Sequence, residues 1–278
     1  MPRQLGRPGG SVSVARRKRV LATPGKGDWT ANKAVSRGLT TGMKIRVAYV
    51  DEPPFYWTGS DGDATGVDIE LAEAVLGAIG ATSVEFISVE FGELLPGLKA
   101  GQWEVNVPIF ITPERAREVS FTRPVWSLVD GFVVAKGNPL GLNGYADVAA
   151  QPAARLGVIP GQVQLDAAIT AQVPDERLVR FRDQAEGVAA LLAGTIDAFA
   201  GTALGNRAVT ASEPALEDVV LVVGVEGALS GAFSVRRGSA LLDPLNRELG
   251  NYLGSKERRE SAARYGMTAT EIDPVLAQ

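Results

Sequence analysis

The sequence of 278 residues contains neither cysteine nor histidine. This absence excludes a thiol nucleophile, a Ser-His-Asp triad, a zinc site built on Cys or His, and an imidazole base. It also excludes disulfides, so the redox compartment cannot be read from thiols. Any catalysis would depend on carboxylates, lysine, tyrosine or serine, and no cofactor is expected.

Long hydrophobic runs and a strong net charge are missing as well. No window approaches the roughly 18 consecutive apolar residues of a membrane span, and the formal net charge is only -4. A nucleic-acid partner is therefore not expected. The basic run from Arg16 to Arg19 is followed by a short, partly polar stretch, so no secretory signal peptide is recognisable.

Residues 1–42 differ from the remainder of the chain. They are rich in Gly, Ser, Thr, Arg and Lys and show little periodicity, which is typical of segments that cannot build a packed core. We expect a disordered or non-native extension here. Contact of its basic run with an anionic surface is the alternative.

From Met43 onward, strand and helix patterns alternate, which predicts parallel sheets flanked by helices. In the first half the expected strands are 44–50, 84–89 and 105–109, with helices at 67–79 and 91–100. A second series follows, with strands at 131–136, 156–159 and 196–200 and helices at 163–171 and 188–193. Two last strands, 219–223 and 232–235, precede a helical C-terminus. Two α/β halves are therefore predicted.

One motif stands at the end of the third expected strand. Thr112 is placed to cap a short helix with Pro113 at its first position. Arg115 then falls in the first turns of that helix, beside the end of the strand.

The stretch ITPERAREVSFTRP at residues 111–124 resembles the "T-x-x-R … F-S-x-P" signature of periplasmic solute-binding proteins of the polar-amino-acid class, family 3, which serve ABC importers. Shorter matches are GVDIELA at 66–72, LPGL at 95–98, AGTIDA at 193–198 and DPLN at 243–246. The resemblance covers about residues 43–272. It implies a periplasmic monomer that binds a small ligand and docks on the membrane permease of the importer.

The resemblance also implies the type II fold of these proteins. Two lobes, each a mainly parallel sheet flanked by helices, are joined by two hinge strands and close on a ligand in the cleft. The first lobe would be discontinuous, comprising residues 43–131 and 227–278. The second lobe would comprise residues 132–226.

The family's arginine, here Arg115, is implied to hold the ligand carboxylate with its planar fork of donors. Arg117 lacks this support and is expected to be solvated. Amino-acid binders usually carry a small hydroxyl residue and an Asp where this sequence has Phe110 and Thr202. An α-ammonium group would lose its expected carboxylate, which disfavours an ordinary α-amino acid.

Within the family, the sequence most resembles the ectoine and hydroxyectoine binders. There an aromatic cage, matched by Phe55, Phe91 and Phe110, holds a delocalised cation, and an acidic residue matching Glu52 contacts the same end. Tyr56, Trp57 and Trp126 are candidates to extend the cage, whereas Trp103 is expected in the core. The expected ligand-binding residues are Arg115, Glu52, Phe55, Phe91, Phe110, Gln162, Val163 and Thr202.

Three departures from that subgroup leave the ligand open. Phe91 replaces a Tyr, Pro108 falls where Gly is usual, and Gly161-Gln162-Val163 replaces Gly-Thr-Thr. The helix that follows Gln162 can still donate to a carboxylate from its N-terminus. Ectoine, hydroxyectoine, a betaine, a polar amino acid or an opine-like compound all remain candidates.

An enzyme similar to cyclohexadienyl dehydratase is the alternative of another class, because it uses this same fold with an acid in the cleft. The candidate residues are one carboxylate, one arginine and several phenylalanines. They include no nucleophile and no acid/base pair. We therefore expect a binding protein and not an enzyme. A receptor ectodomain would need a membrane span and a signalling domain, and this sequence shows neither.

Overall fold

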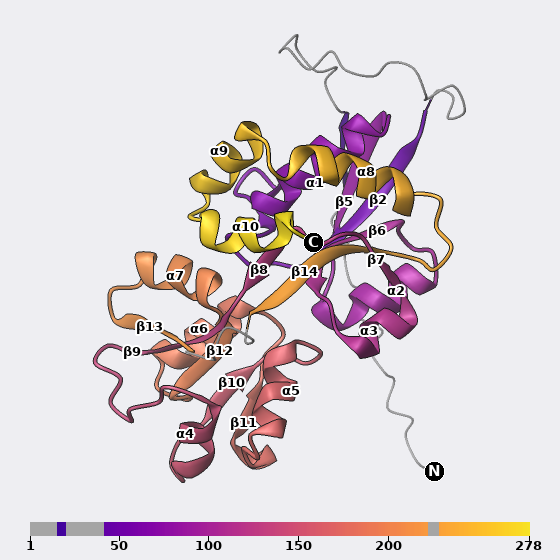
Figure 1. Cartoon of the computed structure of the whole chain (residues 1–278). Coiled ribbons are helices and arrows are strands. Elements are labelled where there is room, and N and C mark those ends of the chain that lie inside the picture. Colours follow the sequence, from indigo (N-terminus) through magenta and orange to yellow (C-terminus); the bar gives the residue numbers. More distant parts are fainter. Residues whose placement is uncertain (1–15, 21–41, 222–227) are drawn as a thin grey trace, which may run out of the picture.

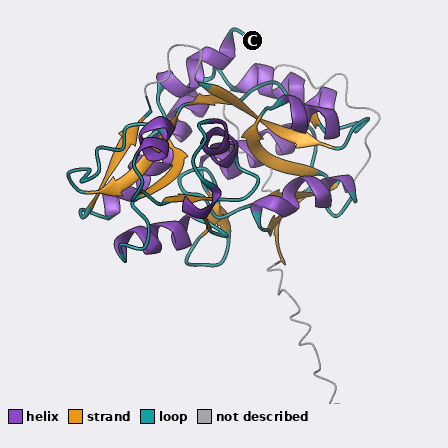
Figure 2. Cartoon of the chain, turned by 90° about the horizontal axis from the view of Figure 1, so that it is seen from below, coloured by secondary structure: helices purple, strands orange, loops and turns teal. Residues whose placement is uncertain are grey.

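The computed structural model describes residues 16–20, 42–221 and 228–278. They form two mixed α/β units, each built on one sheet, in the upper and lower halves of Figure 1. Helices enclose the strands of both sheets (Figure 2). The expected α/β fold class is confirmed.

The larger sheet has seven strands in the order β1-β5-β2-β6-β14-β7, with β8 paired to β14. The strands are β1 (Arg16–Val20), β2 (Lys44–Tyr49), β5 (Ser83–Ser88), β6 (Val105–Phe110), β7 (Ser120–Phe121), β8 (Trp126–Leu128) and β14 (Leu229–Val235). Strands β5, β2 and β6 are parallel, as expected for βαβ units, while β14 runs antiparallel to β6. A short hairpin of β3 (Trp57–Thr58) and β4 (Ala64–Thr65) lies apart from this sheet.

The smaller sheet has five strands in the order β11-β10-β12-β9-β13. The strands are β9 (Asp130–Ala135), β10 (Leu156–Val158), β11 (Leu178–Arg180), β12 (Ala198–Thr202) and β13 (Leu216–Val220). Its parallel part is β11, β10 and β12, and β9 and β13 are antiparallel additions. Each sheet therefore contains three parallel strands, to which antiparallel strands are added.

Helices from the first and last parts of the chain belong to the larger unit, and helices from the middle part belong to the smaller unit. Those of the larger unit are α1 (Val67–Ala78), η1 (Phe91–Glu93), α2 (Leu94–Lys99), α3 (Pro113–Glu118), α8 (Leu242–Tyr252), α9 (Lys256–Arg264) and α10 (Ala269–Leu276). Those of the smaller unit are α4 (Tyr145–Ala150), α5 (Val163–Thr170), η2 (Asp175–Arg177), α6 (Gln184–Leu192) and α7 (Ala203–Ser212). Among the described residues, no helix is long and apolar enough to cross a membrane.

The chain passes between the two sheets twice. The first passage is the single residue Val129 between β8 and β9, and the second joins β13 to β14. The expected lobe boundary at residue 131 falls just inside β9. The boundary at 227 lies outside the described residues, so the division into lobes stays a prediction.

The structure differs from the expectation for residues 1–42 at one place. Strand β1 pairs antiparallel with β5, from Arg16 opposite Ile87 to Val20 opposite Ser83. An edge strand such as β5 offers unpaired N–H and C=O groups to any neighbouring extended segment. The five residues RRKRV show no alternation of polar and apolar types, so this pairing could not be predicted from the sequence. Residues 1–15 and 21–41 lie outside the described residues.

Trp103 belongs to the core of the larger unit, as expected. Its side chain is buried and its indole Nε1 donates to Asn106 Oδ1 at 2.6 Å. Its ring lies so close to Gly97 of α2 that a Cβ there would come within 2.0 Å of it. The glycine of the LPGL stretch is therefore required by packing.

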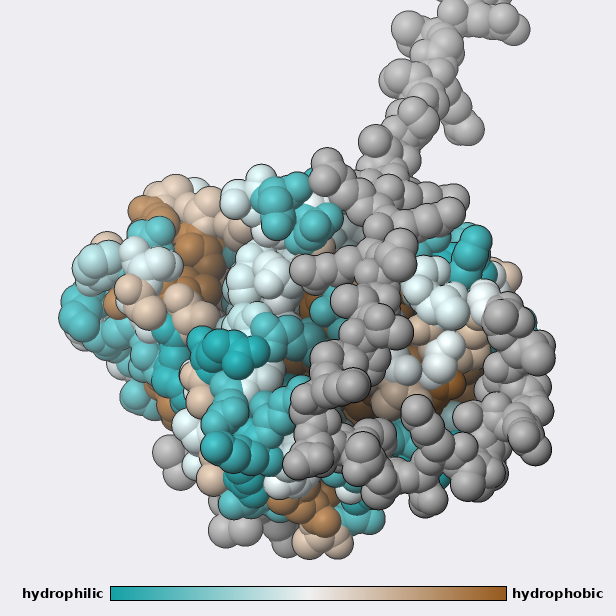
Figure 3. Space-filling model, turned by 90° about the horizontal axis from the view of Figure 1, so that it is seen from above, coloured by the Kyte–Doolittle hydropathy of each residue, from teal (hydrophilic) through white to brown (hydrophobic). Residues whose placement is uncertain are grey.

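The outer surface carries few large hydrophobic residues. Ile169, Leu192, Val220 and Leu229 are the exposed ones among the described residues. On the face shown in Figure 3, hydrophilic residues alternate with small hydrophobic patches.

Candidate binding site

A cavity lies between the two units. We call its two sides the first wall, from elements of the larger unit, and the second wall, from elements of the smaller unit. The first wall consists of Glu52, Phe55, Tyr56, Phe91, Ile109, Phe110, Arg115, Trp126 and Leu128. The second wall consists of Gln162, Val163, Gln164 and Thr202.

All eight expected ligand-binding residues are among these lining residues. Tyr56 and Trp126, the candidates to extend the cage, also line the cavity. Trp57 does not, because its ring packs against Tyr265 with a centroid distance of 6.1 Å. The sequence reasoning missed Ile109, Leu128 and Gln164. Gln164 could have been found from its place in the first turn of α5, beside two residues that were expected.

Arg115 is held in place by local structure and reaches both walls. Thr112 caps α3 by accepting a hydrogen bond from the Arg115 backbone N–H at 3.2 Å. The guanidinium donates from Nη1 to the Phe110 carbonyl at 2.7 Å and from Nη2 to the Gly161 carbonyl at 2.8 Å. Its central carbon lies 5.4 Å from the centroid of the Phe91 ring. Burial lowers the pKa of Arg115, yet the guanidinium keeps further N–H donors for a ligand.

Arg117 lies on the same short helix but points to solvent, as expected. Its side chain is 71% exposed and forms an ion pair with Glu114. The two arginines of one helix therefore differ sharply in environment.

Glu52 is the acidic group of the cavity. Its Oε2 accepts a hydrogen bond from Gln162 Nε2 at 3.0 Å, which joins the first wall to the second. Burial raises the pKa of Glu52 to about 7, and the nearby carboxylates Asp68 and Asp130 act in the same direction. Among the described lining residues, Glu52 is the one carboxyl group and Arg115 the one cation.

Aromatic rings make up most of the remaining first wall. Trp126 lies at their centre, with ring centroids 5.9 Å from Phe55 and 5.2 Å from Phe110. The contact with Phe110 is edge to face. Phe55 in turn packs against Tyr56 at 6.0 Å. These contacts hold the rings in a continuous aromatic surface beside the cavity.

The second wall is polar but uncharged. Gln162 and Val163 lie at the start of α5, and Thr202 caps α7 by accepting a hydrogen bond from the Gly205 backbone N–H at 3.1 Å. Gln164 donates from Nε2 to Asp130 Oδ1 at 2.8 Å. With the hydrogen bond from Gln162 to Glu52, three of these four side chains are already engaged with the protein itself.

Pro108 lies in a local irregularity of β6. The register with β14 shifts between Ile109 opposite Ala232 and Asn106 opposite Ser234, leaving one extra residue on β6. A β-bulge is one of the places in a sheet that tolerates proline. The partner strand needs no backbone N–H donor at such a position, and proline has none to offer. The Pro108 carbonyl accepts a long hydrogen bond of 3.4 Å from the Tyr56 hydroxyl. The proline therefore fits the sheet and stays beside the aromatic surface.

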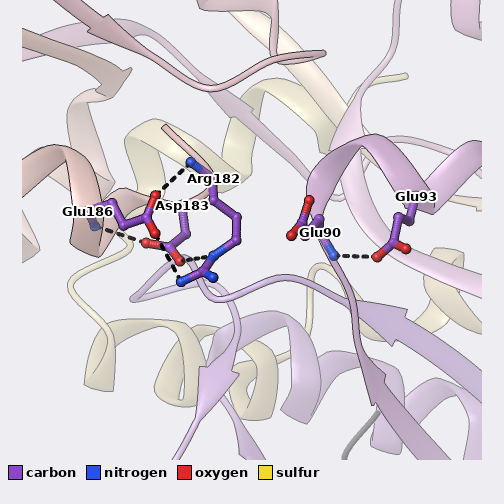
Figure 4. A network of polar contacts seen from close by, with 5 residues as sticks. All are labelled: Glu90, Glu93, Arg182, Asp183 and Glu186. Carbon is purple, nitrogen blue, oxygen red and sulfur yellow. Dashed lines mark hydrogen bonds and ion pairs between the residues drawn. The ribbon is translucent and has the colours of Figure 1, made fainter. Parts of the chain in front are cut away.

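Glu90 and Glu93 of the larger unit lie opposite Arg182, Asp183 and Glu186 of the smaller unit (Figure 4). On one side, the Glu90 backbone N–H is bonded to the Glu93 carboxylate. On the other side, Arg182 is paired with Asp183 and Glu186. The pKa of Arg182 is raised mainly by its hydrogen bond to Asp183 and the charge of Glu186, and Glu90 adds to this across the gap.

In the described part of the chain, no group of three or more Asp or Glu side chains is arranged to hold a metal ion. The residues that line the cavity offer ion pairing, hydrogen bonding and contact with aromatic rings.

Comparison with protein families gives one match across most of the chain. The model of the bacterial extracellular solute-binding proteins, family 3, matches residues 45–268. A probable amino-acid ABC transporter periplasmic-binding protein, y4tE of Sinorhizobium fredii, is 28% identical over 82% of this chain and 78% of its own length. The ABC transporter arginine-binding protein 1 of Escherichia coli is 30% identical over 56% of this chain and 61% of its own length.

Solved structures show the same fold. EhuB in complex with hydroxyectoine superposes with a TM-score of 0.74 and 30% identity, covering 84% of this chain and 94% of EhuB. The ancestral amino acid-binding protein AncCDT-1, a precursor of cyclohexadienyl dehydratase, gives a TM-score of 0.71 at 23% identity, over 80% and 94% of the two chains. The latter likeness concerns the fold alone.

Proposed function

Because the chain belongs to family 3 of the bacterial extracellular solute-binding proteins, we propose that it is the periplasmic binding component of an ABC importer for a small zwitterion such as ectoine or hydroxyectoine. Its relative in Sinorhizobium fredii is named as a probable periplasmic binding protein of an amino-acid ABC transporter. EhuB, a structural neighbour, was solved with hydroxyectoine. The partner would be the membrane permease of the importer.

The observation that carries the proposal is the distribution of charge in the cavity. One guanidinium, Arg115, and one carboxyl group, Glu52, stand on a wall that otherwise consists of aromatic and aliphatic side chains. A ligand with one carboxylate and one cationic group can satisfy both. A ligand with only one charge would leave the other protein group buried without an oppositely charged partner, which is costly.

The aromatic surface favours one kind of cation. Ring faces attract weakly hydrated, delocalised cations by roughly 0.5–2 kcal/mol, and Phe55, Phe110 and Trp126 supply such rings beside Glu52. A primary ammonium group would instead need several acceptors arranged around it. Thr202, in the second wall, is neutral and already caps α7. These features support an ectoine-like or betaine-like cation over an α-ammonium group.

A polar amino acid or an opine-like compound is the second candidate. The match to an arginine-binding protein favours it, and so does the presence of Glu52, because a carboxyl group can pair with any cationic side chain. This candidate predicts that common amino acids stabilise the protein and that ectoine and betaines do not.

The dehydratase alternative gains little from the cavity. Asp68 and Asp130 act on Glu52 electrostatically, but neither belongs to the described lining. No second carboxyl group is therefore placed in the described cavity to serve as an acid/base partner. Incubating any bound ligand with the protein and following it by NMR would test this reading, because an enzyme would consume it.

A thermal-shift screen tests the proposal. The panel contains ectoine, hydroxyectoine, glycine betaine, proline betaine and the common amino acids, since a ligand that binds only the folded state raises its stability. Arg115→Ala is compared with Arg117→Ala, its matched control on the same helix. We expect ectoines or betaines to raise the melting temperature of the native protein and of the control, and not that of Arg115→Ala. Stabilisation by amino acids alone would contradict the proposed ligand class.

A further inference from the structure

Behind the aromatic surface, one buried carboxyl group contacts a cavity ring directly. Asp68, in the first turn of α1, is fully buried, and its Oδ2 accepts a hydrogen bond of 3.0 Å from Trp126 Nε1. Asp68 is not among the cavity-lining residues, whereas Trp126 is. The single polar hydrogen of the Trp126 indole is thus directed away from the cavity and into the protein.

The Trp126 ring is also fixed from another side. Trp126 on β8 lies opposite Gly231 on β14, and a Cβ at Gly231 would come within 2.0 Å of the ring. The backbone of β14 therefore lies directly against the indole. Together with Asp68, this contact leaves the ring little freedom to turn its N–H toward a ligand.

Asp68 is in turn held by the C-terminal part of the chain, which lies over α1 (Figure 1). Arg258 of α9 is fully buried, with Nη2 3.9 Å from Asp68 Oδ1 and Nη1 donating to the Val67 carbonyl at 3.2 Å. Asp68 Oδ1 itself has no hydrogen-bond partner in the described residues. Burial raises the pKa of Asp68 to about 7, while Arg258 and the Trp126 N–H oppose this rise.

A purely stabilising role explains this arrangement poorly. Buried ion pairs are weak evidence for stability, because apolar residues of similar volume often replace them without loss. The neighbouring Glu70 already ties the same region to α1, through hydrogen bonds from Ser261 and Tyr265 and an ion pair with Arg264. What Asp68 adds, and Glu70 lacks, is contact with a cavity-lining ring.

We infer that Asp68 is a positioning residue for ligand recognition, which fixes the Trp126 indole so that the ring offers the cavity its π system and no hydrogen-bond donor. This inference rests on the proposed function, because it concerns the same site. Arg258 supports it by holding the Asp68 carboxyl group. The consequence is a wall that favours ligands whose cation contacts a ring and gives no advantage to ligands that need a donor at this place.

The first test requires no ligand. Indole N–H signals of 15N-labelled protein are recorded by NMR, and Trp126→Phe identifies the Trp126 signal among the four tryptophans. We expect this signal to be shifted downfield and slow to exchange in the native protein. It should move but stay protected in Asp68→Asn, which keeps an acceptor oxygen, and lose protection in Asp68→Leu. An unchanged signal in Asp68→Leu would overturn the inference.

The second test measures binding of hydroxyectoine by calorimetry in a double-mutant cycle. We expect Asp68→Leu to weaken binding about tenfold when Trp126 is present, in line with the loss of a hydrogen bond to a charged group. In the Trp126→Phe background the same change should have less than about a twofold effect, because no N–H remains to be held. Equal losses in both backgrounds would show a structural role only.

Two further proteins complete the design. Glu70→Gln is the matched control, and we expect it to lower the melting temperature without changing the dissociation constant. If Asp68→Leu does not fold, Asp68→Asn takes its place in the cycle, with a smaller effect in the same direction. Failure of hydroxyectoine to bind the native protein would count against the proposed function, while the NMR signal of Trp126 would still decide the role of Asp68.

Discussion

The two walls of the cavity differ in what they offer a ligand. The first wall carries both charged groups, Arg115 and Glu52, and all of the aromatic rings, whereas the second wall carries two glutamines, a valine and a threonine. Two hydrogen bonds at the cavity link the units, and each joins a charged residue of the first wall to a neutral group of the smaller unit: Arg115 to the Gly161 carbonyl, and Glu52 to the Gln162 amide.

This difference suggests a division of labour. Under the proposed function, the first wall would recognise the ligand by charge and by ring contact, and the second wall would cover it with hydrogen-bonding groups. Substitutions on the first wall should therefore change which ligand binds and how tightly. Those on the second wall should have smaller effects on affinity.

The largest effect is expected for Arg115. Hydrogen bonds to a charged group contribute about 1.5–3 kcal/mol each. If Arg115 holds the ligand carboxylate by two such bonds, as proposed, Arg115→Ala should weaken binding about 100-fold or more. Calorimetry with the ligand found in the screen measures this. Arg117→Ala should bind normally, and similar losses in the two variants would mean that Arg115 contributes only to folding.

Glu52 should have the next largest effect, with a distinctive pH dependence. Its pKa is raised to about 7, so a cationic ligand, which favours the carboxylate, should bind more tightly as the pH rises from about 6 to about 8. Glu52→Gln should bind about tenfold more weakly at pH 8 and lose most of this dependence. Asp68, whose pKa in the native protein is also raised to about 7, is present in both proteins, so the difference between their pH profiles reports on Glu52. Equal pH profiles would contradict this role.

Without ligand, the pH dependence of stability has the opposite sign. Because the pKa of Glu52 is raised from 4.5 to about 7 in the folded protein, its contribution to stability is full below pH 4.5 and is lost as the pH rises through about 7. Glu52→Gln should therefore flatten the fall in the free energy of unfolding across this range. Denaturant titrations at several pH values measure it.

On the second wall, Gln162→Ala should weaken binding only about two- to tenfold, as expected for one neutral hydrogen bond. The variant loses the bond between Gln162 and Glu52 that joins the walls, so the ligand should dissociate faster while associating at a similar rate. Stopped-flow fluorescence separates the two rates. A loss of affinity as large as that of Arg115→Ala would show that the second wall contributes as much to binding as the first.

The smallest effect on affinity is expected for Thr202. Its hydroxyl caps α7, so Thr202→Val should lower the free energy of unfolding by about 1 kcal/mol with little change in binding. Thr202→Ser keeps the cap and should resemble the native protein. If Thr202→Val abolished binding while Thr202→Ser did not, the hydroxyl would be a ligand contact, and the second wall would take part in recognition.

Much of the fold followed from the sequence where its pattern was local. The helix over 67–79 was predicted within one residue of α1, and the strand over 105–109 within one residue of β6. By contrast, β11, α4 and α7 were not predicted. The segment of α7, ALGNRAVTAS, contains few large apolar residues, and its beginning depends on the cap by Thr202, the last residue of the buried strand β12. Strand β1 depends on pairing with a distant strand, which no local pattern encodes.

The candidate site shows a similar limit. Residues named by a motif, such as Arg115, could be placed in the cavity because the motif fixes the strand, the cap and the turn together. Asp68 was part of a recognised stretch, but its contact with Trp126 joins positions that are 58 residues apart. Only the folded chain brings such groups together, so their role could not be inferred from spacing.

The most direct test of the central claim is a calorimetric titration of the native protein with hydroxyectoine, repeated in the presence of excess glutamine, whose one cation is an α-ammonium group. If the first wall recognises a carboxylate and a delocalised cation together, hydroxyectoine should bind in both experiments with nearly the same dissociation constant. If glutamine abolishes the hydroxyectoine heat, or binds when hydroxyectoine does not, the aromatic surface does not select the cation and the proposed ligand class is wrong.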